Sequence, residues 1–96
     1  MLSERALALA PRDPAVLDTR GMILLRSGEA SRALELLGRA ASTDLAPPES
    51  RIHLAQALIE SGDKTAARAV LTLTLNTPED ASAHHAATTL LQHLEP

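Results

Sequence analysis

Histidine is the residue type in this chain best suited to metal or acid–base chemistry, and four are present, at positions 53, 84, 85 and 93. His84 and His85 point about 100° apart around a helix, and His93 follows more than two turns later. Two imidazoles that share one ion on a helix need a spacing of four residues, which no pair here has. The pattern therefore favours exposed or partly packed histidines over a metal site.

Other catalytic arrangements are also missing from the sequence. The chain has no cysteine, which excludes a thiolate nucleophile, and no Gly-x-Ser-x-Gly elbow. Its four glycines do not form a phosphate-binding loop. Glu79 and Asp80 are adjacent acids, but the first turn of a helix explains them better than a catalytic pair does. We therefore predict a non-enzyme without catalytic residues, cofactor or metal.

The charge and composition also argue against nucleic acid and membrane partners. Nine Lys and Arg residues are outweighed by twelve acids, the net charge is -3, and there is no aromatic side chain on which a base could stack. No apolar run approaches the roughly 20 residues that a spanning helix needs. Glu4 and Arg5 interrupt the region where a signal peptide would be apolar. We expect a soluble chain in the cytoplasm or periplasm, without membrane insertion.

The composition predicts an all-α fold. Leu and Ala supply 36 of the 96 residues, whereas Val occurs twice and Phe, Tyr and Trp never occur. Proline and glycine positions delimit six expected helices: 2–10, 14–26, 30–43, 48–60, 64–75 and 79–94. The segment 70–75 alternates apolar and polar residues like a strand, but no other segment offers it an edge. We interpret it as the fraying end of a helix.

Residues that can cap helices precede several of these segments. Asp13 stands directly before Pro14, a pairing typical of a helix start. Glu29 and Asp63 each follow a glycine, and both are predicted to cap the helix that comes next. Thr77 before Pro78 predicts the start of the last helix in the same way.

The sequence repeats itself with a period of 34 residues. Ser27 and Gly28 correspond to Ser61 and Gly62 at this offset. Further matching pairs are Gly21 with Ala55, Leu24 with Leu58, Glu29 with Asp63, Ala33 with Ala67, and Leu37 with Leu71. A period of this length, built of two helices, indicates stacked helical hairpins. The small residues are expected to let paired helices approach closely, Gly21 beside Ala33 and Ala55 beside Ala67.

These positions resemble the tetratricopeptide repeat. The first repeat carries the pattern on Leu17, Arg20, Gly21, Leu24, Ala33, Leu37 and Ala40, and the second on Arg51, Leu54, Ala55, Leu58, Ala67, Leu71 and Thr74. Aliphatic or polar residues stand where the family has aromatic ones, so we expect modest stability. The resemblance implies an all-α, right-handed solenoid in one domain. It would comprise a half repeat (1–13), two full repeats (14–47 and 48–78) and a capping helix (79–96).

A narrower resemblance concerns the source of the chain. Residues 13–40 and 51–71 are similar to the last repeats of bacterial tetratricopeptide lipoproteins linked to exopolysaccharide export and protein sorting. On that reading the chain would be a structural C-terminal piece of a longer scaffold. This is the alternative to a module with a partner of its own.

The family resemblance implies non-catalytic binding of a peptide or protein in a concave groove lined by the first helix of each repeat. Carried over to this sequence, the groove residues are Asp18, Met22, Leu25, Arg26, Glu49, Ile52, Gln56, Ile59 and Glu60. Met22 and Ile52 are expected to face solvent in the free protein. Acids at positions 18 and 49 would repel a terminal carboxylate, which argues against the chaperone-tail-binding subclass. The other reading is that some of these residues pack on the last helix.

The N-terminal segment predicts weak self-association. Residues 2–10 read as the second helix of a repeat whose first helix is absent. Leu2, Ala6 and Leu9 form one stripe, and Leu7 lies about 140° from Leu2, so a single neighbouring helix cannot cover them all. Uncapped solenoid ends are adhesive. We therefore expect a weak homodimer through this helix, or else a monomer in which it frays.

Overall fold

The computed structural model describes residues 13–42, 48–76 and 81–94, and helices dominate all three ranges. The helices are α2 (Pro14–Arg26), α3 (Ala30–Ala41), α4 (Pro48–Glu60), α5 (Lys64–Leu75) and α6 (Ala81–Leu94). They confirm the predicted helices after the first. The expected helix at 2–10, and the homodimer built on it, lie outside the described residues, as do residues 43 and 79–80.

The segment with strand-like alternation is helical throughout. Residues 70–75 belong to α5, and the Thr74 hydroxyl donates a hydrogen bond to the Val70 carbonyl at 2.9 Å. The threonine that looked like a strand residue is thus satisfied by the helix backbone itself. The helical interpretation of this segment is confirmed.

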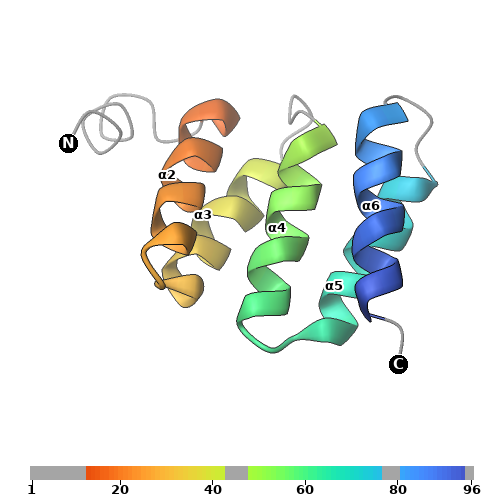
Figure 1. The fold of residues 1–96 in the computed structure, drawn as a ribbon. Helices are drawn as coiled ribbons and strands as arrows, with labels where there is room; N and C mark the ends of the chain where they lie inside the picture. Colours follow the sequence, from red (N-terminus) through yellow and green to blue (C-terminus); the bar gives the residue numbers. More distant parts are fainter. Residues whose placement is uncertain (1–12, 43–47, 77–80, 95–96) are drawn as a thin grey trace.

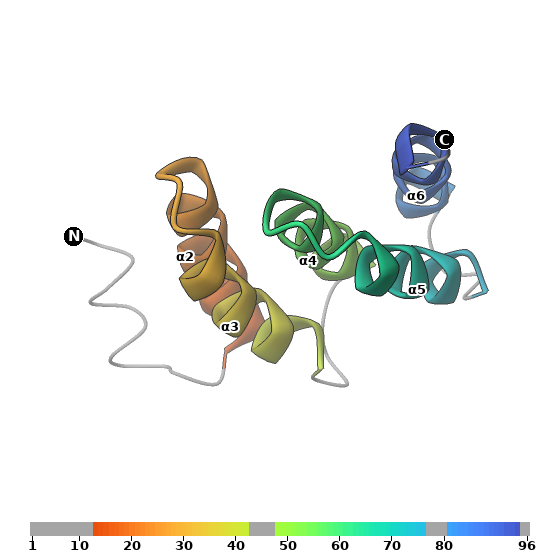
Figure 2. The ribbon, with the colours of Figure 1, turned by 90° about the horizontal axis from the view of Figure 1, so that it is seen from below.

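The helices form antiparallel hairpins, and the two helices of each hairpin lie in different layers (Figures 1 and 2). α2, α4 and α6 lie side by side in one layer, while α3 and α5 form the other. Each helix packs mainly on its neighbours in the chain, with additional contacts from α4 to α2 and to α6. This is an all-α helical-hairpin solenoid, as the repeat predicted.

The turns of the two hairpins are built alike. Each contains a glycine in the left-handed region, with φ of +81° at Gly28 and +92° at Gly62. In the first turn the Glu29 amide donates to the Leu24 carbonyl at 2.9 Å, and the same bond recurs 34 residues later, also at 2.9 Å. These turns are Schellman motifs, which need a residue that tolerates positive φ. The period seen in the sequence is therefore a period of backbone geometry.

Aspartate caps two of the helices as expected. The Asp13 carboxylate accepts a hydrogen bond from the Ala15 amide at 2.9 Å, and Asp63 accepts one from the Ala66 amide at 3.1 Å. Each bond satisfies an amide that has no partner within its own helix. These local bonds fix where α2 and α5 begin.

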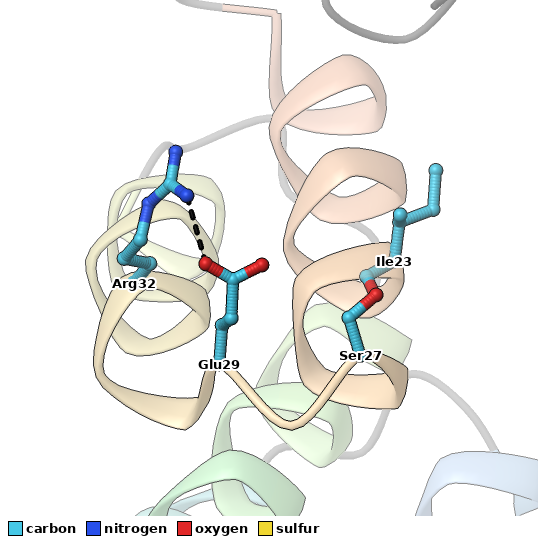
Figure 3. Close-up of polar contacts among 4 residues, drawn as sticks. All are labelled: Ile23, Ser27, Glu29 and Arg32. Atoms are coloured by element: carbon cyan, nitrogen blue, oxygen red, sulfur yellow. Dashed lines mark hydrogen bonds and ion pairs between the residues drawn. The ribbon is translucent and has the colours of Figure 1, made fainter.

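Glu29 departs from this scheme. It occupies the N-cap of α3 but makes no side-chain capping bond. Its carboxylate instead forms an ion pair with Arg32 at 2.8 Å, next to the turn in which Ser27 donates to the Ile23 carbonyl at 2.9 Å (Figure 3). The prediction of a side-chain cap at Glu29 is therefore wrong. The extra methylene of glutamate carries its carboxylate past the first-turn amides to the arginine one turn on.

The core consists of two apolar clusters. One joins α2 and α3 to α4, through Leu24, Leu25, Ala33, Leu37 and Ala57. The other joins α4, α5 and α6, through Ile52, Ala55, Ala67, Leu71, Ala83, Ala87 and Leu94. Equivalent residues of the two repeats are equally buried, since Ala33, Ala67, Leu37 and Leu71 are all 0% exposed. The repeat thus reproduces its packing as well as its turns.

Gly21 makes the closest approach between paired helices. A Cβ atom at this position would lie 2.6 Å from Cγ of Leu37, so the glycine is needed for contact with that side chain. The expected close packing exists, and the side chain nearest to Gly21 is that of Leu37, which belongs to the same cluster as Ala33. The equivalent position in the second repeat, Ala55, accommodates a Cβ and is fully buried.

α6 closes the second cluster. Ala83, Ala87 and Leu94 are buried, and Leu90 and Leu91 are half-buried against the same cluster. An apolar face of this kind is what the capping helix expected at the end of the chain requires. Among the described helices, none has the length and apolar character needed to cross a membrane.

Candidate interaction groove

A cavity of about 350 Å³ lies on the layer formed by α2, α4 and α6. Its lining comes from all three helices: Met22, Leu25, Arg26, Gln56, Ile59, Glu60 and Leu90. Six of these seven belong to the predicted groove. Leu90 of α6 is the addition, and the apolar face of the last helix was the sequence signal that could have revealed it.

Helical spacing explains why these residues meet. Met22 and Arg26 are four residues apart on α2, and Gln56 and Glu60 are four apart on α4. Side chains at this spacing lie one above the other on the same face of a helix. Because α2 and α4 lie side by side, the two rows face one cavity near the carboxyl ends of both helices.

Three of the predicted groove residues, Asp18, Glu49 and Ile52, lie outside this cavity, and some of the others are more buried than expected. Ile52 is only 6% exposed and belongs to the cluster that α5 and α6 cover, so the expectation that it faces solvent is wrong. Leu25 lines the cavity, yet it too is a core residue at 7% exposure. Met22 is half-buried rather than open. The other reading given by the sequence, that some of these residues pack on the last helix, fits Ile52, because its cluster includes Ala83, Ala87 and Leu94 of α6.

Asp18 is engaged in a pair that crosses from α2 to α4. Nδ1 of His53 lies 2.9 Å from both carboxylate oxygens of Asp18. Both side chains are largely buried: 29% of the His53 side chain and 18% of the Asp18 side chain are exposed. The hydrogen bond to Asp18 raises the pKa of His53 above its ordinary value of 6.5, against the lowering effect of burial. The nearby charge of Glu49 raises this pKa further, and that of Arg26 lowers it.

Comparison with known proteins places this geometry in a family. The tetratricopeptide-repeat model matches residues 24–91, which is more than two thirds of the chain. The chain belongs to the tetratricopeptide-repeat family. Neither the curated proteins nor the solved structures give a match. The narrower resemblance to exopolysaccharide and sorting lipoproteins therefore has no support from these comparisons.

Membership of the family identifies the position of each helix within its repeat. In a tetratricopeptide array, α2 and α4 are the first helices of successive repeats, and such repeats are commonly protein-interaction modules that are typically non-catalytic. The cavity lies on the layer that contains these first helices. α6 stands beside α4 in the same layer and supplies Leu90.

Arg26 and Glu60 are the charged members of the cavity lining. Both side chains are exposed, and neither takes part in an ion pair within the described part of the chain. They differ in this from Asp18, which pairs with His53. The tetratricopeptide groove thus offers one cation and one anion beside an apolar floor of Met22, Ile59 and Leu90.

The remaining histidines lie away from this groove chemistry. On α6, Nδ1 of His93 is 2.8 Å from the Thr89 carbonyl, one turn back on the same helix. Over residues 13–42, 48–76 and 81–94, no three His, Asp or Glu side chains gather closely enough to hold a metal ion.

Proposed function

We propose that this tetratricopeptide-repeat chain is a non-catalytic interaction module that binds a segment of a partner protein between α2, α4 and α6. One observation carries the proposal. The cavity of about 350 Å³ lies on the layer of first helices and combines an apolar floor with exposed, unpaired charges. Binding sites of this kind are mostly apolar, with a few polar groups that orient the ligand.

The layout of charge supports a peptide over a nucleic acid. Glu49 and Glu60 are exposed acids on α4, and Arg26 of α2 lines the same cavity as Glu60. A phosphate backbone would meet more like charge than opposite charge along this helix. An extended or helical peptide can instead place apolar side chains into the cavity and polar ones against its rim.

A peptide selection tests this function. A random peptide library displayed on phage is selected against the wild-type chain, and the enriched sequences are then measured against variants. Arg26→Glu reverses an exposed rim charge, and Met22→Glu places a charge in the apolar floor. Both are expected to reduce binding at least about tenfold, in line with the loss of a central contact.

Leu73→Glu is the matched control. Leu73 is the large apolar side chain that α5 exposes on the other layer, with 54% of its surface accessible. This variant should bind the selected peptides as the wild type does. If no peptide is enriched, or if Leu73→Glu weakens binding as strongly as the groove variants, the groove is not the binding site. The alternative, a structural stretch of a longer array without its own partner, would then be favoured.

A further inference from the structure

The chemistry of the cavity lining specifies the anchor that fits it. We propose that the partner inserts an aromatic side chain, flanked by a basic residue, into the cavity between α2, α4 and α6. This inference rests on the proposed function and names the class of partner segment that the groove recognises.

The cavity has the size and floor for an aromatic ring. An apolar cavity of about 150 Å³ is known to hold benzene, and this one measures about 350 Å³. Met22 is half-buried in its wall, and the thioether of methionine makes favourable contacts with aromatic rings. Ile59 and Leu90 complete an apolar surface without any polar atom in their side chains.

Arg26 adds a cation at the rim. Its guanidinium is exposed and forms no ion pair within the described residues, so it is available to a ligand. A cation over the face of an aromatic ring is attracted by the negative π-surface. The ring therefore complements Arg26 and Met22 together, whereas an aliphatic side chain of the same size complements neither.

The flanking residue follows from the acids of α4. Glu60 lines the cavity and Glu49 is exposed about three turns earlier on the same helix. Asp18 already has His53 as a partner at 2.9 Å, so it is not counted among the acids open to a ligand. The two acids of α4 outnumber its one arginine, Arg51, so a Lys or Arg next to the aromatic anchor would be attracted to this helix.

The sequence excludes a second copy of these 96 residues as the source of the ring. No Phe, Tyr or Trp occurs anywhere in the chain. The aromatic anchor must therefore belong to a different chain or segment, which separates this inference from self-association.

Three blocked dipeptide amides test the inference. The probes are acetyl-Phe-Lys amide, its cyclohexylalanyl-Lys counterpart, which has a ring without π-electrons, and acetyl-Phe-Glu amide. Binding is followed by the shifts of the Met22, Ile59 and Leu90 signals in NMR spectra. The Phe-Lys probe should bind about fivefold more tightly than the cyclohexyl probe, the advantage expected of cation–π and sulfur–aromatic contacts. The Phe-Glu probe should bind more weakly than Phe-Lys at low salt.

Variants assign the effect to the rim cation. Arg26→Gln should remove the cation–π part of this advantage and bring the Phe-Lys affinity closer to that of the cyclohexyl probe, whereas Arg39→Gln, at an exposed position of α3 in the other layer, should leave both unchanged. Equal affinity of the two ring probes for the wild type would overturn the aromatic anchor and leave the groove function standing. If none of the probes shifts the cavity signals, the inference is also overturned. The peptide selection then decides the groove function separately.

Discussion

At the scale of single residues, alanine substitutions at Gly21 and Gly38 test whether the interior is close-packed. We expect Gly21→Ala to lower the free energy of unfolding by about 1–3 kcal/mol, since its Cβ would lie 2.6 Å from Cγ of the fully buried Leu37. Gly38→Ala should instead raise it by about 0.5–1 kcal/mol, because a Cβ there meets no atom within 4 Å and alanine favours the helix. Urea unfolding followed by circular dichroism measures both.

The opposite signs make this comparison informative, because both substitutions are Gly to Ala inside a helix. A stabilised Gly21→Ala variant would show that α2 and α3 are not in tight contact at Leu37. If the clash is the cause, the double variant Gly21→Ala with Leu37→Ala should lose less stability than the sum of the losses of the two single variants.

The pair of His53 and Asp18 predicts a pH dependence of stability. The folded-state pKa of His53 is raised above its ordinary value of 6.5, so the folded state binds the proton more tightly than the unfolded state. The stabilisation is fully present below about pH 6.5 and is lost as the pH rises through the folded pKa. The wild type should therefore lose more stability between pH 6 and pH 8 than His53→Gln does. Urea unfolding at the two pH values measures this difference.

Asp18→Asn serves as the second arm of that experiment. It leaves the histidine in place but removes the carboxylate that raises its pKa, so this variant should also lack the stability change. An NMR titration of the wild type that places the pKa of His53 at or below 6.5 would contradict the assignment of the pair.

At this scale the sequence was only partly predictive. Asp18 and His53 are 35 residues apart, one more than the period, so the repeat itself indicated that they lie on adjacent first helices. Their pairing then depends on the rotation of α4 against α2. The burial of Ile52 likewise depends on how α4, α5 and α6 pack together. Both facts come from packing between helices, which no local pattern encodes.

At the scale of helices, capping distinguishes the two repeats. Asp63→Ala should lower the free energy of unfolding by about 1 kcal/mol, because it removes the bond of 3.1 Å to the Ala66 amide. Glu29→Ala should change it by less than about 0.5 kcal/mol, since Glu29 makes no capping bond and its ion pair with Arg32 is exposed. Thermal unfolding of both variants measures the difference.

Equal losses at the two positions would contradict this prediction and would show that Glu29 caps α3 in solution. The comparison also shows why helix positions were predictable from sequence while cap bonds were not. The positive-φ glycines and the prolines fix helix ends through backbone geometry alone. A cap bond depends in addition on side-chain length, and aspartate and glutamate differ in that respect.

At the scale of the whole molecule, stability is transmitted from neighbour to neighbour. One cluster joins the first hairpin to α4, and the other joins α4 and α5 to α6. α4 is therefore shared between the two clusters, whereas α6 contributes to one cluster only. In such an array each unit is held by its neighbours, and an end helix protects everything beneath it.

Removal of the last helix tests this view of α6 as a cap. A chain ending at residue 76 would uncover Ile52 and Leu71, which are 6% and 0% exposed in the whole chain, and would lose the burial of Leu94. We expect a loss of at least about 3 kcal/mol in the free energy of unfolding, from the burial of large apolar side chains. Circular dichroism should show a larger loss of helix than the removal of α6 alone accounts for. Binding of a hydrophobic dye should increase.

Point variants in the full chain separate capping from a general effect of truncation. Ala87 is 0% exposed, so Ala87→Glu would bury a charge between α6 and the cluster and should reproduce most of the loss. His85→Glu, on the exposed side of the same helix, should leave the melting temperature nearly unchanged. If the truncated chain melts like the whole one, α6 does not seal the array. In that case Leu90 would also be a loosely held wall of the cavity, and peptide binding should survive the truncation. If α6 is a true cap, stability and binding are lost together.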